Sequence, residues 1–143
     1  MTGGAHARID RVFVDTSGFF ARSDRDDNHH TEALAIQQRL IVNNTAWFIS
    51  SYVIAETHAL FLRRLGLRQG LEFLERVQAS NLTVVRVTAA DDLNASNVMR
   101  QYDDKDFSFT DATAFVIMQR LGIRYSFTFD RHFAQYGVET LSA

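Results

Sequence analysis

Short apolar runs alternate along the chain with longer stretches in which apolar residues recur every three or four positions. The short runs are typical of buried strands, and the longer stretches are typical of amphipathic helices. The expected strands span Arg8–Val14, Ala46–Ile49, Leu82–Val87, Ile123–Phe129 and Gly137–Leu141. Because strands and helices alternate over nearly the whole chain, the pattern predicts an α/β domain with a mostly parallel sheet.

Residues that favour helix ends mark the segments between these strands. The helix before Ala46 is expected to begin with a cap at Asp27 or Asn28 and to present one apolar stripe, formed by Ala33, Leu34, Ile36, Gln37, Leu40 and Ile41. Serine or threonine caps and terminal glycines bound the later helices. The other expected helices are a short one after Asp15-Thr16-Ser17-Gly18 that ends near Arg22, and the segments Tyr52–Leu65, Arg68–Ala79, Thr88 to about Tyr102, and Phe109–Leu121.

Two aspartates are expected at the same edge of the sheet, because each directly follows a strand. Asp15 follows the first strand, and Asp130 follows the strand that ends at Phe129. In parallel α/β sheets, functional groups collect beyond the carboxyl ends of the strands. Either aspartate can also serve only as the N-cap of the helix or turn that comes after it.

Glu56 is a third acidic candidate, because the expected helix surrounds it with apolar positions. Its neighbours one turn away are Tyr52, Val53, Ala59 and Leu60. Burying a carboxylate there without a partner would cost several kcal/mol, so the pattern favours a functional role. The alternatives are a salt bridge to an arginine and a helix orientation that exposes Glu56.

Asp111 is the fourth candidate, and it stands at the start of the most apolar helix. Ser108-Phe-Thr-Asp111 resembles a capping box. A helix this apolar is expected to be central, which places its amino end near the sheet. Capping and catalysis are compatible here, because a helix N-terminus favours anions. Capping alone remains the alternative.

Together the four acids predict a metal site. Two carboxylates about 4 Å apart repel each other by roughly 4 kcal/mol at an effective dielectric of 20, so a cluster of four requires protons or cations. The chain has no cysteine, and an all-oxygen set suits Mg²⁺ or Mn²⁺. Such ions activate water and bind phosphodiester oxygens. The expected chemistry is hydrolytic phosphoryl transfer.

The segments that carry these acids also resemble a known family. They are Val-Phe-Val-Asp15-Thr-Ser17, Ala55-Glu56-Thr with Leu62-Arg-Arg-Leu-Gly66, Phe107-Ser-Phe-Thr-Asp111-Ala, and Thr128-Phe-Asp130-Arg-His-Phe133. In order, spacing and flanking residues they are similar to the PIN domains of VapC-type toxins. The resemblance covers nearly the whole chain, from about Asp10 to Leu141.

The resemblance implies a PIN-like three-layer α/β/α fold and a Mg²⁺- or Mn²⁺-dependent endoribonuclease that leaves a 5′-phosphate. It also implies inhibition by a small cognate antitoxin of the VapB kind, and a homodimer. By this likeness Asp15, Glu56 and Asp111 are metal ligands or metal-organising acids, and Asp130 is the fourth member of the set. Ser17 and Thr128 match positions that donate hydrogen bonds into the site.

Composition and charge limit the possible domain organisation and mode of RNA binding, but they do not indicate a function. The 143 residues are expected to form one PIN domain over residues 8–143, preceded by a flexible extension at residues 1–7. With a formal net charge of −2, the chain does not hold nucleic acid by charge alone, so RNA binding depends on a local site. We find no apolar run long enough for a membrane span and no secretory leader, so a cytoplasmic protein is expected.

Other charged and aromatic residues are secondary candidates. The basic residues proposed to contact RNA or an acidic antitoxin tail are Arg131, Arg63, Arg64 and Arg68. For the last three, a solvated helix end is an equal alternative. His132 adjoins Asp130 and can face the cleft, but packing or surface placement is favoured over acid/base work. Asp24 to His30 looks like a metal cluster, but a solvated loop is the favoured interpretation. Trp47, Phe19 and Phe20 are candidates for a partner groove as well as for the core.

Three other functions stay open at this point. The chain can be a PIN nuclease of RNA processing outside a toxin–antitoxin pair, or a non-catalytic PIN module that serves as a binding scaffold. A scaffold would be expected to lack one or more of the acids. The third is an acid-cluster phosphatase or phospho-receiver, but phosphatases of that type usually carry Asp-x-Asp after the first strand. Here Thr16 and Ser17 follow Asp15.

Overall fold

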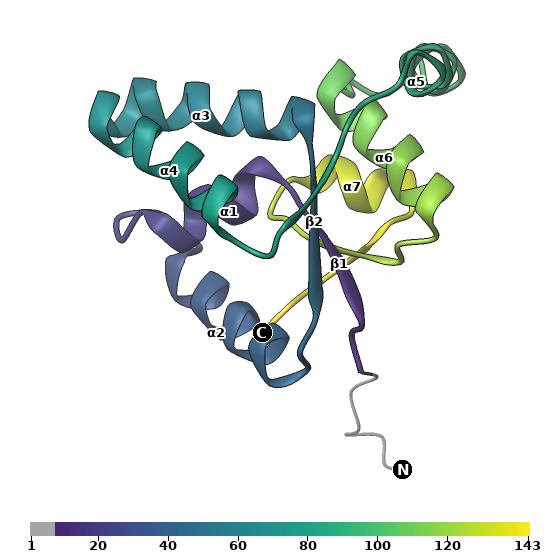
Figure 1. Cartoon of the computed structure of the whole chain (residues 1–143). Helices are drawn as coiled ribbons and strands as arrows, with labels where there is room; N and C mark the ends of the chain where they lie inside the picture. Colours follow the sequence, from purple (N-terminus) through teal and green to yellow (C-terminus); the bar gives the residue numbers. More distant parts are fainter. Residues whose placement is uncertain (1–7) are drawn as a thin grey trace.

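Five short parallel strands form the centre of the protein (Figure 1). In the computed structural model, which describes residues 8–143, they are β1 (Arg11–Val14), β2 (Ala46–Ser50), β3 (Thr83–Val85), β4 (Tyr125–Phe127) and β5 (Glu139–Thr140). Their order in the sheet is β3-β2-β1-β4-β5, and all four pairs of neighbours run parallel. The predicted parallel sheet is confirmed, whereas the predicted extension at residues 1–7 lies outside the described residues.

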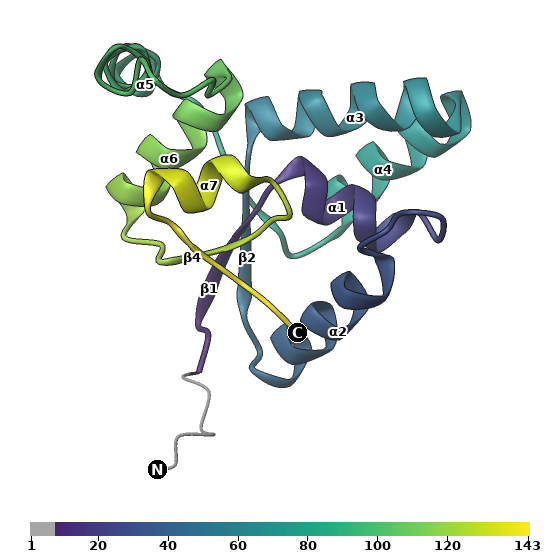
Figure 2. The same ribbon diagram turned by 180° about the vertical axis from the view of Figure 1, so that it is seen from behind.

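Helices cover both faces of this sheet (Figures 1 and 2). They are α1 (Thr16–Ser23), α2 (His30–Val42), α3 (Ser51–Leu65), α4 (Leu67–Ala79), α5 (Ala89–Gln101), α6 (Phe109–Leu121) and α7 (Arg131–Tyr136). In both views α1 to α4 lie on one side of β1 and β2, with α5 and α6 on the other. Helix α7 packs on α6, where the rings of Phe133 and Phe115 meet edge to face at 4.9 Å. The architecture is therefore three-layered, α/β/α.

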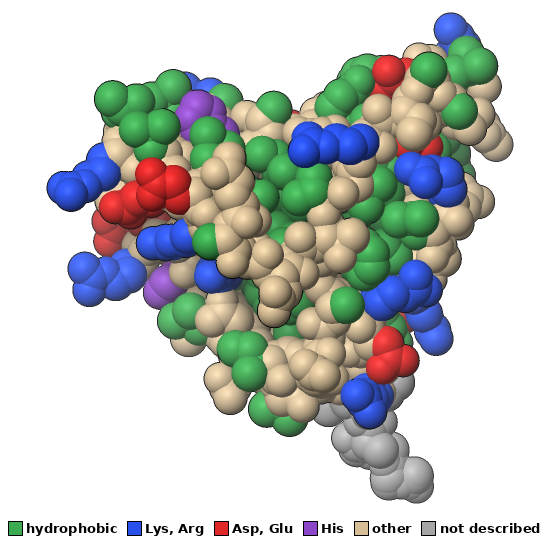
Figure 3. All heavy atoms as spheres, viewed as in Figure 1, with side chains coloured by type: hydrophobic (Ala, Val, Ile, Leu, Met, Phe, Trp, Pro, Cys, Tyr) green, Lys and Arg blue, Asp and Glu red, His purple; other side chains and the backbone are tan. Residues whose placement is uncertain are grey.

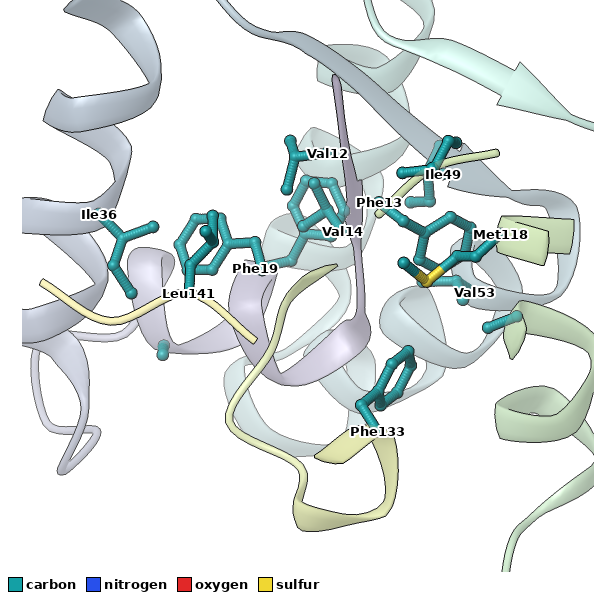
Figure 4. Close-up of a cluster of buried hydrophobic side chains, with 14 of the residues drawn as sticks. Val12, Phe13, Val14, Phe19, Ile36, Ile49, Val53, Met118, Phe133 and Leu141 are labelled. Carbon is teal, nitrogen blue, oxygen red and sulfur yellow. The ribbon is translucent and has the colours of Figure 1, made fainter. Parts of the chain in front are cut away.

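The hydrophobic core explains why β1 and α6 are the most apolar elements. Val12, Phe13 and Val14 of β1 are all fully buried, because β1 is the middle strand and is covered on both faces. Figure 4 shows Phe13 pointing to the side that holds Ile49 and Met118. Helix α6 is buried at every position from Asp111 to Met118, so it is a central helix, as its sequence predicts.

Several predicted boundaries need correction. The strands β1, β3, β4 and β5 are each shorter than predicted, because the apolar runs extend beyond the residues that pair in the sheet. Helix α2 begins at His30 with His29 at the N-cap and no side-chain cap, so the cap predicted at Asp27 or Asn28 is wrong. Asp27 instead accepts the backbone N–H of His29 in the preceding turn.

The predicted buried stripe on α2 is narrower than expected. Ala33, Ile36 and Leu40 are fully buried, but Leu34 and Ile41 are 43% and 59% exposed. The buried residues of α2 are spaced three and four positions apart, so they form one narrow line along the helix. Large apolar side chains thus remain on the surface of α2.

The strand order places a switch point beside β1. The chain passes from β1 to β2 and β3 in one direction, and then returns to add β4 and β5 on the other side of β1. In the register of β1 and β4, Val14 pairs with Phe127. The residues that follow these two strands therefore lie side by side at the carboxyl edge, where sheets of this type form their binding crevice.

Candidate metal centre

Asp15 is held in place by the two strands that meet at the switch point. Its backbone N–H donates to the carbonyl of Phe127 at 3.2 Å, and its side chain caps α1 by accepting the N–H of Ser17. The hydroxyls of Ser17 and Thr128 both donate to Asp15 Oδ2 at 3.0 Å. All three bonds to the side chain reach Oδ2, so Oδ1 of this buried carboxylate is available to a ligand.

Thr128 and Ser17 connect the two acidic loops as well as orienting Asp15. Their hydroxyl oxygens lie 3.1 Å apart. Oγ1 of Thr128 accepts the backbone N–H of Asp130 at 3.0 Å, and Oγ of Ser17 accepts the backbone N–H of Phe129 at 2.8 Å. A shift of the loop after β4 would therefore displace Asp15 and Asp130 together.

Asp111 approaches the same edge from the amino end of α6. It forms the predicted capping box, in which its Oδ2 accepts the N–H of Ser108 at 3.2 Å and its own N–H donates to Ser108 Oγ at 3.0 Å. Only 5% of Asp111 is exposed. Capping and membership of the acid cluster are thus combined in this residue.

Asp130 lies at the N-cap of α7 and brings His132 into the cluster. Its Oδ1 accepts the backbone N–H of His132 at 2.9 Å. Nδ1 of the His132 ring lies 2.8 Å from the same Oδ1 and 3.4 Å from Asp111 Oδ2, while its Nε2 lies 2.8 Å from Asp106 Oδ1. One imidazole therefore contacts three aspartates.

Burial and mutual repulsion alter the charge state of this cluster. Burial, followed by the charges of Asp111 and Asp130, raises the pKa of Asp15 to about 7 despite its hydrogen bonds to Ser17 and Thr128. Burial and the charge of Asp130 likewise raise the pKa of Asp111. For His132, burial acts to lower the pKa, but the hydrogen bond to Asp106 and the surrounding carboxylates raise it overall. The cluster thus favours bound positive charge.

Glu56 does not share the burial of Asp15 and Asp111. It occupies an exposed position of α3, so the expected apolar enclosure was wrong. The buried face of α3 is formed by Val53, Thr57 and Phe61, and Glu56 lies beside this face. One turn earlier, Tyr52 contacts Phe109 of α6 with ring centroids 5.8 Å apart. This flank of α3 therefore faces the amino end of α6, two residues before Asp111.

The outline of the molecule dips between the helices on the two sides of the sheet. In Figure 1 the carboxyl end of β1 points toward the region between α3 and α6. The space-filling view from the same side shows the outline dipping between the part built by α3 and the part built by α5 (Figure 3). An extended ligand can therefore approach the carboxyl edge of the sheet from this side.

The predicted basic contacts differ in their position. Arg131 is exposed and lies close enough to Asp106 to lower the pKa of that carboxyl, after the larger effect of His132. Arg63 and Arg64 are exposed in the last turn of α3, and Arg68 forms an exposed ion pair with Glu72 at 3.7 Å. Of the four, Arg131 lies nearest to the acids in the sequence, directly after Asp130.

Sequence reasoning missed Asp106, and it favoured the wrong alternative for His132. Packing or surface placement of His132 was preferred to a position facing the cleft, yet its ring contacts the acids. A usable signal was its position two residues after Asp130, because an N-cap side chain and the residue two positions later meet in the first helical turn. Nothing comparable marked Asp106. The loop interpretation of Asp24 to His30 is confirmed, since Asp24 and Asp27 accept backbone N–H groups within it.

The donor groups fit a divalent cation. Ligand atoms of Asp111, Asp130 and His132 all lie within 4.8 Å of one another. Asp15 is coupled to this group through the charges of Asp111 and Asp130. Oxygen-rich sets of this kind suit Mg²⁺ and Mn²⁺. A bound cation would relieve the repulsion between the carboxylates that raises their pKa values, and this relief would contribute to the binding of the cation.

A comparison with family models matches residues 12–139 to the family described as PIN domain. The chain belongs to the PIN-domain family. Among its sequence relatives is the 23S rRNA-specific endonuclease VapC20 of Mycobacterium tuberculosis, which is 31% identical over 127 residues, or 88% of this chain and 94% of the relative. Ribonuclease VapC26 of the same organism is 27% identical over 124 residues, or 86% and 90% of the two chains. The resemblance to VapC-type PIN domains is thus confirmed.

Solved structures agree with this assignment. The crystal structure of Mycobacterium tuberculosis VapC20, described as a sarcin-ricin loop cleaving toxin, matches this PIN domain with a TM-score of 0.83 at 29% identity, covering 92% of this chain and 99% of that one. FitAcB from Neisseria gonorrhoeae matches with a TM-score of 0.66 at 15% identity, over 91% and 96% of the chains, and shows the fold alone. The three-layer PIN-like architecture expected from sequence is confirmed. Within residues 8–143, no helix combines the length and apolar character that crossing a bilayer requires.

Proposed function

We propose that this VapC-type PIN domain is a Mg²⁺- or Mn²⁺-dependent endoribonuclease that acts as the toxin of a toxin–antitoxin pair. One observation carries the proposal: ligand atoms of Asp111, Asp130 and His132 lie within 4.8 Å of one another, and the charges of Asp111 and Asp130 act on the buried Asp15, whose pKa is raised to about 7 by burial and this repulsion. The VapC relatives, which are named as ribonucleases, support RNA as the substrate.

The proposed roles follow from the contacts of each residue. Asp15, Asp111 and Asp130 hold the cation, which when bound activates water and stabilises the charge on the scissile phosphate. Ser17 and Thr128 keep Asp15 oriented through their hydroxyls. The exposed Glu56 acts from the α3 side of the dip between α3 and α5, and we place Arg131 against an RNA phosphate, because both side chains are accessible.

The test compares Asp111→Asn with the wild-type protein on a panel of structured and single-stranded RNAs in Mn²⁺. We expect a loss of cleavage of about 100-fold or more, because a ligand contributes at least as much as its supporting contacts. Products should carry 5′-phosphates. Asp103→Asn, an exposed position outside the cluster, is the matched control. If the wild-type protein leaves the whole panel intact, or if Asp111→Asn still cleaves at the wild-type rate, the proposal is wrong.

The toxin role is tested in cells. Induced expression of the wild-type chain should arrest growth, and the same expression of Asp111→Asn should not. Arrest that survives the substitution would contradict a catalytic origin of toxicity. Cleavage in vitro without arrest would instead favour a PIN nuclease of RNA processing.

We also propose that an antitoxin segment binds a pocket of about 540 Å³ at the far end of α1 from the acids. Its lining is aromatic and cationic, with Phe19 and Arg22 from α1, Trp47 from β2, and Phe73 and Arg76 from α4. The guanidinium of Arg22 lies over the Trp47 ring at 5.9 Å, and no carboxylate of residues 8–143 pairs with it. Burial and the charge of Arg76 lower the pKa of Arg22. An acidic segment with apolar side chains complements this lining.

A homodimer is the last element of the proposal. Four large apolar side chains are exposed where α3 turns into α4, namely Leu62, Leu65, Leu67 and Leu71. Exposed apolar residues grouped at one turn are typical of a contact surface. Sedimentation of the wild-type protein and of Leu65→Asp should show a dimer and a monomer respectively, and a wild-type monomer would contradict the proposal.

A further inference from the structure

We propose that His132 is a nitrogen ligand of the divalent cation and that Asp106 orients its ring for this purpose. The inference rests on the proposed function, since it concerns the same site. It adds the imidazole of His132 to the three proposed carboxylate ligands and assigns a positioning role to Asp106. His132 and Asp106 are both identified by their contacts alone.

The first observation is the environment of His132 Nδ1. This nitrogen is completely buried and has no hydrogen-bond partner among residues 8–143. It lies 2.8 Å from Asp130 Oδ1 and 3.4 Å from Asp111 Oδ2. The shorter distance would suit a hydrogen bond, but the direction of the contact does not. A buried nitrogen aimed between two carboxylates without a hydrogen bond is the arrangement that a shared cation completes.

The second observation is the contact on the other side of the ring. Nε2 of His132 lies 2.8 Å from Asp106 Oδ1. A proton on Nε2 that is donated to Asp106 leaves Nδ1 as a lone pair directed at the acids. Histidines that bind metals characteristically donate their second ring nitrogen to a carboxylate in this way, which fixes both the tautomer and the ring orientation.

The ring is also fixed by packing. The edge of Phe107 meets His132 with centroids 5.8 Å apart and planes at 88°, and only 17% of the His132 side chain is exposed. The backbone N–H of His132 donates to Asp130 Oδ1, so the ring and that carboxylate belong to one rigid turn. A preformed ligand pair loses little entropy when an ion binds.

The spacing of the donor atoms agrees with octahedral coordination. Adjacent ligands of an ion with bonds of about 2.1 Å lie about 3 Å apart, and opposite ligands about 4.2 Å apart. The two contacts of Nδ1, at 2.8 Å and 3.4 Å, bracket the adjacent spacing. The three ligand atoms are confined within 4.8 Å, so small side-chain movements suffice to bind one ion.

A nitrogen ligand has a consequence for metal preference. Carboxylates and water suit Mg²⁺ and Mn²⁺ alike, whereas imidazole favours ions later in the transition series over Mg²⁺. We therefore expect this site to bind Mn²⁺ more tightly than Mg²⁺, and His132 to account for part of the difference.

The decisive experiment detects the nitrogen directly. Electron spin-echo spectroscopy of Mn²⁺ bound to the wild-type protein should show coupling to a directly bound ¹⁴N, and this readout needs no variant to fold. The coupling should disappear in His132→Gln and persist in His29→Gln, whose ring stacks on Phe129 outside the acid set. A second variant, Asp106→Asn, tests the residue that orients the ring. Its control is Asp104→Asn, because the carboxylate of Asp104 pairs with Lys105 and not with His132.

Calorimetric titration completes the test. We expect His132→Gln to weaken Mn²⁺ binding at least about 10-fold and Mg²⁺ binding less, with Asp106→Asn weakening Mn²⁺ binding by about 10-fold. A wild-type protein that binds neither ion would overturn the proposed function itself. A wild-type protein that binds Mn²⁺ without nitrogen coupling, and whose affinity is unchanged in His132→Gln, would overturn only the assignment of His132.

Discussion

At the scale of single residues, the buried carboxylates of the acid cluster lower the stability of the metal-free protein. Asp15 is 3% exposed and its pKa is raised to about 7, chiefly by burial and then by Asp111. Its ordinary pKa of 3.8 applies to the unfolded chain. Between these two values the folded protein binds more protons than the unfolded chain does. The stability of the metal-free protein therefore falls as the pH rises from about 4 to about 7.

This sign gives a prediction for Asp15→Asn in the presence of a chelator. Asparagine retains the capping geometry but carries no charge, so the variant should be more stable than the wild-type protein at pH 8, by about 1–4 kcal/mol. The gain should vanish near pH 4, where Asp15 is protonated in the folded protein. Denaturant titrations at several pH values measure it, with the exposed Asp26→Asn as control. A pH-independent difference, or a loss of stability at pH 8, would show that Asp15 is not strained by its burial.

At the scale of elements, the site depends on the contact between α1 and β4. A Cβ atom on Gly18 would lie 2.4 Å from the carbonyl oxygen of Phe127 and 3.1 Å from its ring. Only glycine allows the first turn of α1 to approach the end of β4 this closely. The same turn contains Ser17, whose hydroxyl connects Asp15 with the loop after β4.

We therefore predict that Gly18→Ala destabilises the protein by about 1–3 kcal/mol, because the backbone of α1 must move away from β4. Mn²⁺ affinity should fall in the same variant, since Asp15 moves with the helix. Gly70→Ala is the matched control. Its Cβ would meet the ring of His58 at 3.2 Å and the backbone nitrogen of Leu62 at an ordinary contact distance of 3.6 Å. Alanine also favours the helix by about 0.5–1 kcal/mol over glycine. Equal melting temperatures for Gly18→Ala and the wild type would contradict this account.

Most elements could be predicted from the sequence because their signals are local. The capping boxes at Thr88 and Ser108 mark the starts of α5 and α6. Strand lengths were overestimated, since apolar residues continue beyond the last ladder bond into loops that are also buried. The cap of α2 was misplaced because Asp27 satisfies a backbone N–H in a turn that precedes the helix.

The site was only partly predictable, for a geometric reason. Asp15 and Asp130 follow adjacent parallel strands, so their meeting follows from topology. The exposure of Glu56 depends on how α3 is rotated about its axis, and its sequence has apolar residues on both flanks. The role of His132 depends on Asp106, whose approach is set by the loop before α6. Contacts of this kind arise only from tertiary packing.

At the scale of the whole molecule, the two ends of α1 present different chemistry. Its first residues adjoin the acids, and its last turn contributes Arg22 to the cationic pocket. The net charge of −2 therefore conceals a separation of charge along this helix. A ligand that binds the cation and a partner that binds the pocket would therefore contact opposite ends of α1.

This separation predicts that partner binding and catalysis can be altered independently. Arg22→Gln should weaken binding of the proposed antitoxin at least about 10-fold, because a partly buried cation is lost. The rate of RNA cleavage by the isolated protein should be unchanged. Calorimetry with Arg25→Gln, an exposed arginine near the same helix, provides the comparison. Wild-type affinity in Arg22→Gln would place the partner elsewhere.

The order of the strands also has a consequence for how the protein is made. Synthesis proceeds from the amino end, and β4 takes its place beside β1 only after residue 127 has left the ribosome. Until then Asp15 lacks Thr128 and Asp130, so no unfinished chain carries the assembled acids. The acid cluster therefore assembles only after the segment through Asp130 has been synthesised.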